Sequence, residues 1–221
     1  MTVRVKICGL TRAEDVALAV SLGAHAVGVV LAPSPRRVEV GEAAAILEHA
    51  GPRTLRVGVF VDPAPDFVAR AVHACRLDYV QLSGSETARD ARAIARRVAA
   101  LAPRPVRLLK AVHVSSAEDV TRCAEYPADA FLLDAPAVDG RMGGTGSGFH
   151  WEFAADPPWS RARVWLAGGL HAGNVAEAVA ALRPAFVDVS SGVEDSPGRK
   201  SAAKIAAFIA AAGAVPAEAA P

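Results

Sequence analysis

Short apolar runs alternate along the chain with longer Ala-rich amphipathic runs. The apolar runs are rich in β-branched residues and nearly continuous, which is typical of parallel strands buried on both faces. They predict eight strands, at residues 3–8, 24–31, 55–61, 79–82, 106–110, 130–134, 163–167 and 186–189.

The amphipathic runs predict a helix after nearly every strand, at residues 12–22, 42–50, 65–75, 87–101, 117–124, 172–182 and 201–211. Only a weak helix signal, near residues 151–153, follows the sixth strand. Thr11 and Glu14 have the spacing of an S/T-x-x-E capping box, which predicts the start of the first helix.

This strand–helix repeat predicts an α/β fold with a parallel sheet. A doubly wound open sheet would usually carry a Gly-rich dinucleotide-binding turn after its first strand, and Cys8-Gly9-Leu10-Thr11 lacks that pattern. Eight units of this size close naturally into a (β/α)8 TIM barrel. We therefore expect a single-domain barrel over residues 1–212, followed by a disordered Ala/Pro-rich tail at residues 213–221.

Composition narrows the partners that such a barrel would have. Of the 221 residues, 52% are hydrophobic, which suits a large buried core. The chain has 24 Lys and Arg against 23 Asp and Glu, so no long-range attraction to nucleic acid or to an anionic membrane is expected. No apolar run is long enough to span a bilayer, and no signal-peptide core is present at the N-terminus.

Three cysteines, Cys8, Cys75 and Cys123, are too few and too widely spaced for a disulfide framework or a zinc site. Free thiols suggest a reducing compartment, so we expect a cytoplasmic protein. Cys75 and Cys123 fall within predicted helices and are expected in the core. The histidines show no metal-ligand spacing, and no bound metal is expected.

In a barrel of this kind the reacting groups gather at the carboxyl ends of the strands. Cys8 ends the first predicted strand and Asp134 the sixth, so they are a candidate base and acid facing each other across the mouth. Lys6 shares the barrel face of Cys8 and is expected to help lower the pKa of the thiol. The alternative is that Cys8 is a small core residue and Asp134 a strand-end cap. His113 is the second candidate base.

The ends of the last two strands predict an anion site. Gly168 and Gly169 follow the seventh strand, and Ser191 and Gly192 follow the eighth, in the loops that usually bind phosphate in barrels. Glycines let backbone N–H groups approach an anion, although they also occur in turns that bind nothing. Arg36 is a candidate partner for a substrate carboxylate, or else a solvated surface residue.

Six motifs occur in a fixed order along the chain: Lys6-Ile7-Cys8-Gly9-Leu10-Thr11-Arg12, Ser34-Pro35-Arg36, Leu132-Leu133-Asp134, Gly143-Gly144-Thr145-Gly146, Ala167-Gly168-Gly169-Leu170 and Asp188-Val189-Ser190-Ser191-Gly192. Together they resemble the phosphoribosylanthranilate isomerase family of tryptophan biosynthesis, from residue 3 to about residue 212.

The resemblance implies an enzyme that converts N-(5-phosphoribosyl)anthranilate to 1-(2-carboxyphenylamino)-1-deoxyribulose 5-phosphate by an Amadori rearrangement. It implies that Asp134 is the general acid at the ribose ring oxygen and that Cys8, as a thiolate, is the general base at C2′. No cofactor is implied, because the iminium formed on ring opening is itself the electron sink. A cytoplasmic monomer or homodimer is expected.

The resemblance also assigns binding residues. Arg36 would hold the anthranilate carboxylate, and backbone N–H groups of Gly169, Ser191 and Gly192 would hold the phosphate. We count Gly168 and Asp188 with these substrate-binding residues.

The chain departs from the family pattern at a few positions. Ser83 replaces the usual histidine after the fourth strand, Ser201 the usual aspartate after Lys200, and His150 the aspartate between Phe149 and Trp151. Three other functions therefore remain: a related aminoaldose-phosphate isomerase of secondary metabolism, one of the histidine-pathway type, and a barrel that binds phosphosugars without turning them over. Cys8 argues against the histidine-pathway type, which is expected to have an aspartate at that position.

The Gly-rich segment at residues 140–148 is either a lid or a connector.

Overall fold

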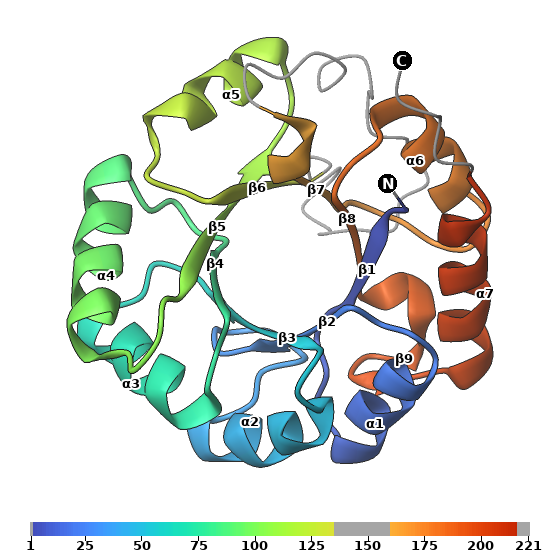
Figure 1. The fold of residues 1–221 in the computed structure, drawn as a ribbon, viewed down its shortest axis with the longest axis horizontal. Helices are drawn as coiled ribbons and strands as arrows, with labels where there is room; N and C mark the ends of the chain where they lie inside the picture. Colours follow the sequence, from blue (N-terminus) through green and yellow to red (C-terminus); the bar gives the residue numbers. More distant parts are fainter. Residues whose placement is uncertain (1, 135–159, 216–221) are drawn as a thin grey trace.

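Eight parallel strands close into a barrel, and the helices surround it (Figure 1). The computed structural model describes residues 2–134 and 160–215. The strands pair in chain order, and β1 pairs with β8 to complete the ring. The predicted (β/α)8 fold class is confirmed.

The predicted strands are all present, with ends that differ by up to three residues from the prediction. They are β1 Arg4–Ile7, β2 Ala26–Val30, β3 Leu55–Phe60, β4 Tyr79–Leu82, β5 Arg107–His113, β6 Ala130–Asp134, β7 Val164–Leu166 and β8 Phe186–Val189. The helices are α1 Ala13–Ser21, α2 Val40–Leu47, α3 Pro65–Cys75, α4 Ala88–Leu101, α5 Ala117–Arg122, α6 Val175–Leu182 and α7 Ala202–Gly213. A short hairpin, β9 Glu194–Ser196 with β10 Arg199–Lys200, follows β8 and was not predicted.

The amino-terminal half of the barrel interior is filled by aromatic side chains. Trp165 of β7 stacks on Phe186 of β8 with ring centroids 3.9 Å apart, and Tyr79 of β4 lies 5.1 Å from Trp165. The guanidinium of Arg4 lies over the ring of Phe186, 4.1 Å from its centroid. A second and larger apolar core lies between strands and helices and includes Cys75 and Cys123, as predicted. Space for a ligand therefore remains at the carboxyl end of the barrel.

The start of α1 differs from the prediction. Helix α1 begins at Ala13, and its N-cap residue Arg12 makes no side-chain capping hydrogen bond. The Thr11 hydroxyl donates instead to the carbonyl of Gly198 in the β9–β10 hairpin at 2.7 Å, and Glu14 pairs with Arg12. The predicted capping box is wrong because a tertiary partner, 187 residues away in sequence, takes the Thr11 hydroxyl.

Some predictions fall outside the described residues. They concern the Gly-rich segment at residues 140–148, the motif of Phe149 and Trp151, and residues 216–221 of the C-terminal tail. Helix α7 continues to Gly213, two residues beyond its predicted end.

Candidate active site

A cavity of about 260 Å³ opens at the carboxyl ends of the barrel strands. Its wall takes side chains from the ends of every strand of the ring and from the loops after β2, β7 and β8. Among the predicted site residues it is lined by Cys8, Arg36, Asp134, Gly168, Gly169, Asp188 and Ser191. Gly192 is the one predicted site residue that does not line it. The cavity therefore gathers residues that lie as much as 183 positions apart in sequence.

Cys8 follows the last residue of β1 and is 8% exposed, with its thiol toward the cavity. Its backbone N–H donates to the carbonyl of Val189 at 2.9 Å, which fixes it beside β8. A Cβ placed on Gly28 of β2 would lie 3.0 Å from both Sγ of Cys8 and Cε of Lys6. The absence of a side chain at Gly28 thus makes room for the thiol and the ammonium to lie close together.

The pKa of the Cys8 thiol differs from the prediction in direction. Burial raises it above the usual value, Lys6 opposes this by favouring the thiolate, and the carboxylate of Asp188 raises it again. The predicted effect of Lys6 is therefore present, but it does not outweigh burial, because removing a thiolate from water costs more than the nearby cation returns.

Lys6 is completely buried within the barrel and is held by two neighbours. Its Nζ donates to Oδ2 of Asp188 and to Oε1 of Gln81, both at 2.8 Å. Burial works against its positive charge, but the charges of Asp188 and Cys8 more than compensate, and the pKa of Lys6 is raised. The second carboxylate oxygen of Asp188, Oδ1, is buried and is the one such side-chain atom in the described residues without a hydrogen-bond partner. Asp188 also lines the cavity, so Oδ1 is available to a ligand hydroxyl.

Asp134 lies at the end of β6, half-buried and on the cavity wall. Strands β6 and β1 are separated in the ring by β7 and β8, so Asp134 and Cys8 approach the cavity from different sides. His113 is the residue paired with Asp134 on β5 and also lines the cavity, but its side chain is exposed.

Arg36 is held by a carboxylate that was not predicted as a site residue. Its Nε and Nη2 donate to the two oxygens of Glu194 at 2.8 and 2.6 Å, a bidentate pair. Lys200, which is buried, donates to Oε1 of Glu194 at 2.8 Å. Burial disfavours the Glu194 carboxylate, but the hydrogen bonds from Arg36 and Lys200 prevail and its pKa is lowered. One edge of the Arg36 guanidinium remains for a ligand.

The loops after β7 and β8 meet at the opposite side of the mouth from β3 and β4. Gly168 and Gly169 have φ of 91° and 63°, which other residues rarely adopt, and both line the cavity with Ser190 and Ser191. Gly192 lies behind them, where an added Cβ would be 2.1 Å from the carbonyl oxygen of Leu170. Its lack of a side chain therefore allows the two loops to pack together.

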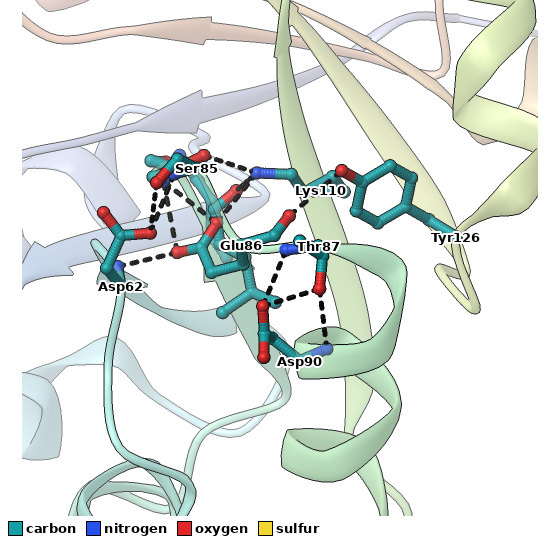
Figure 2. Close-up of polar contacts among 11 residues, drawn as sticks. Asp62, Ser85, Glu86, Thr87, Asp90, Lys110 and Tyr126 are labelled. Carbon is teal, nitrogen blue, oxygen red and sulfur yellow. Dashed lines mark hydrogen bonds and ion pairs between the residues drawn. The ribbon is translucent and has the colours of Figure 1, made fainter.

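A network of hydrogen bonds and one ion pair supports the loops after β3 and β4 on their side away from the cavity (Figure 2). Lys110 of β5 points away from the cavity and donates to Oε2 of Glu86 and to the carbonyl of Gly84, at 2.8 and 2.7 Å. Glu86 accepts the backbone N–H groups of Gly84 and Asp62. Asp62 in turn accepts the N–H and the hydroxyl of Ser85. This network fixes the backbone next to Ser83, whose side chain reaches the cavity.

Sequence reasoning missed Gln81, Glu194 and Ser190 as site residues. Gln81 is a polar residue inside a buried strand, two positions after Tyr79 on the same face, and that alternation was a usable signal. The pairing of Glu194 with Arg36, across 158 residues, has no local signal in the sequence.

Within residues 2–134 and 160–215, no cluster of three or more His, Cys, Asp or Glu side chains could hold a metal ion. In the same ranges no helix has both the length and the apolar character needed to cross a membrane.

A family model described as N-(5'phosphoribosyl)anthranilate (PRA) isomerase matches residues 5–211. The chain belongs to this isomerase family. The relative from Rhodospirillum centenum is 45% identical over 97% of this chain and its own full length, and the one from Trichlorobacter lovleyi is 43% identical over 94% of this chain and 96% of the relative. Both carry the name N-(5'-phosphoribosyl)anthranilate isomerase.

Solved structures of PRA isomerases agree with this. The enzyme from Thermotoga maritima superposes with a TM-score of 0.83 at 39% identity, covering 95% of this chain and 98% of the other. A PRA isomerase in complex with reduced 1-(o-carboxyphenylamino)-1-deoxyribulose 5-phosphate superposes with a TM-score of 0.79 at 37% identity, with the same coverage. The activity of this chain is therefore the aldose–ketose isomerisation of N-(5'-phosphoribosyl)anthranilate in tryptophan biosynthesis, as the resemblance in the sequence implied.

Proposed function

We propose that the barrel carries out this Amadori rearrangement with Asp134 as general acid and Cys8 as general base. The observation that carries the proposal is that the two side chains line one cavity from β6 and β1. A ligand between them has a carboxyl group on one side and a thiol on the other, so one group can protonate the ring oxygen while the other removes the proton from C2′.

The proton balance of the reaction fits these two groups. Asp134 gives a proton to the ribose ring oxygen, the C1′–O bond breaks, and the anthranilate nitrogen lone pair forms an iminium at C1′. The Cys8 thiolate then removes the proton from C2′, and the electrons of that C–H bond form an enolamine. A proton returns to C1′ and the enol oxygen loses its own, which gives the aminoketose. No external oxidant or reductant is consumed, because C1′ is reduced as C2′ is oxidised.

The remaining predicted site residues would bind the two ends of the substrate. Backbone N–H groups of Gly169, Ser191 and Gly192 hold the phosphate, with Gly168 supporting the same loop. Arg36 holds the anthranilate carboxylate through the guanidinium edge that Glu194 leaves open. Asp188, through its unpaired Oδ1, accepts a hydrogen bond from a hydroxyl of the sugar.

We further propose that residues 1–212 form the whole catalytic unit and that the protein is cytoplasmic, where its free thiols stay reduced. It works as a monomer or a homodimer and needs no cofactor. One solved structure of the Thermotoga maritima enzyme is described as mutually generated monomers of a dimeric isomerase, which is consistent with either state.

Turnover of N-(5'-phosphoribosyl)anthranilate tests the assigned roles. We expect Cys8→Ala and Asp134→Asn each to lower kcat by at least about a hundredfold, the usual range for a general acid or base. Cys75→Ala, at a buried thiol in α3 away from the cavity, is the matched control and should keep its turnover. Near-wild-type kcat in either active-site variant would overturn its role.

A further inference from the structure

The hydrogen bonds around Lys6 have a fixed direction. A lysine ammonium only donates, so the Gln81 atom 2.8 Å from Nζ is the amide oxygen. The amide nitrogen of Gln81 therefore faces the other way, toward the Ser83 hydroxyl at 3.0 Å. An amide nitrogen also only donates, and Ser83 Oγ is consequently the acceptor in that contact.

The Ser83 hydroxyl is left with a proton to donate. Its backbone N–H is already used by the carbonyl of Phe60 at 2.8 Å. Among the hydrogen bonds of the described residues, none has the Ser83 O–H as its donor. The side chain is partly buried and lines the cavity, so its free donor direction lies on the ligand side.

The position of Ser83 in the ring limits which substrate group it meets. β4 lies across the barrel from β8, whose loop we propose to bind the phosphate. The substrate group farthest from its phosphate is the carboxylate of the aromatic ring, and a carboxylate is the strongest hydrogen-bond acceptor at that end. The Glu86–Lys110 network of Figure 2 holds the adjacent backbone still, so that the hydroxyl keeps its place.

We propose that Ser83 is a specificity-determining residue that donates a hydrogen bond to the anthranilate carboxylate. Lys6 fixes the orientation of the Gln81 amide, and the amide in turn makes the Ser83 hydroxyl a donor toward the ligand. Arg36 would contact the same group from β2. Gln81 acts as a positioning residue, since its amide nitrogen sets the direction of the Ser83 hydroxyl. This inference rests on the proposed placement of the phosphate, and it concerns a position where the chain departs from its family's usual histidine.

Calorimetric binding of two probes tests the proposal. The first is reduced 1-(o-carboxyphenylamino)-1-deoxyribulose 5-phosphate, and the second is the same compound without its carboxyl group. We expect Ser83→Ala to weaken binding of the first probe about tenfold and to leave the second unchanged. Ser83→Thr keeps a hydroxyl and should restore binding of the carboxylated probe.

Gln81→Glu tests whether residue 81 sets the direction in which the Ser83 hydroxyl donates. A carboxylate at this position still pairs with Lys6 but accepts the Ser83 proton, which turns the donor away from the ligand. We expect the same selective loss for the carboxylated probe, and no further loss when Ser83→Ala is added. Equal weakening of both probes by Ser83→Ala, or no weakening of either, would overturn the proposal. Turnover by Cys8→Ala and Asp134→Asn is independent of this comparison, so failure of the proposed function would be seen separately.

Discussion

Lys6 and Asp188 form an ion pair inside the barrel, with Nζ and Oδ2 2.8 Å apart on the paired strands β1 and β8. They lie beside Cys8, and they act on its thiol in opposite directions: Lys6 favours the thiolate and Asp188 disfavours it. The protonation of the candidate base therefore depends on a pair of residues that need not touch the substrate's reacting atoms.

Lys6→Met is expected to shift the pH dependence of catalysis. Removing the cation takes away the influence that lowers the pKa of Cys8, while burial and the Asp188 carboxylate continue to raise it. The limb of kcat/KM that rises as the base ionises should move to higher pH. Rate profiles of the variant and wild type measure this. Arg97→Met, at an exposed pair with Asp66 between α4 and α3, is the control and should leave the limb in place. An unshifted limb in Lys6→Met would contradict the assigned influence.

Alkylation should distinguish Cys8 from the other two thiols. Burial raises the pKa of Cys75 to about 11 and that of Cys123 to about 12, and both are packed in the core between strands and helices. Only Cys8 opens to the cavity. We expect iodoacetamide to label Cys8 first, with loss of activity in parallel, and the reduced product analogue to slow labelling. Mass spectrometry locates the label, and earlier modification of Cys75 or Cys123 would speak against this account.

Glu194→Gln should weaken both stability and carboxylate binding. The change leaves the buried Lys200 ammonium without its counter-charge, and breaking a buried pair in this way costs about 3 kcal/mol. It also loosens Arg36, so KM should rise more than kcat falls. Denaturant unfolding and steady-state kinetics measure the two effects.

Acid unfolding provides a second measurement on the same variant. The folded pKa of Glu194 is below its ordinary 4.5, so its contribution to stability is present above that pH and is lost as the pH falls through the folded value. Wild type should therefore lose more stability than Glu194→Gln on acidification below about pH 4.5. Parallel losses in the two proteins would show that the carboxylate is not held as described.

Gly192→Ala should separate the two loops of the proposed phosphate site. Its Cβ would lie 2.1 Å from the Leu170 carbonyl oxygen, so one loop must move. We expect KM to rise about tenfold or more and competitive inhibition by inorganic phosphate to weaken, consistent with the sensitivity of sites to small displacements. Gly41→Ala, where a Cβ meets nothing within 4 Å, is the control. Unchanged phosphate inhibition in Gly192→Ala would argue against a phosphate site in these loops.

The barrel could be predicted because each strand and helix carries its own periodic pattern. β4, β6, β8 and α3 have the predicted bounds, and errors elsewhere lie at element ends, where fraying and short 3-10 turns such as Glu48–Ala50 occur. The β9–β10 hairpin was missed since Glu194–Ser196 and Arg199–Lys200 carry no apolar alternation.

Within the candidate site, residues that end a strand could be predicted and their partners could not. Cys8 and Asp134 were found because a strand end has a known place in a barrel. Two contacts arise only when the ring closes. They are the ion pair of Arg36 with Glu194 and the hydrogen bond from the Thr11 hydroxyl to the Gly198 carbonyl. The raised pKa of Cys8 likewise follows from its burial, which a strand pattern does not report.

A structure of the protein with reduced 1-(o-carboxyphenylamino)-1-deoxyribulose 5-phosphate tests the central claim most directly. The distances to measure are those from Cys8 Sγ to C2′ and from the Asp134 carboxyl to the oxygen that comes from the ribose ring. We expect both to be about 3.5 Å, as in a near-attack geometry, with the two groups on different sides of the sugar chain. A complex in which either side chain lies beyond contact with the sugar carbons, while the phosphate is bound, would contradict the account.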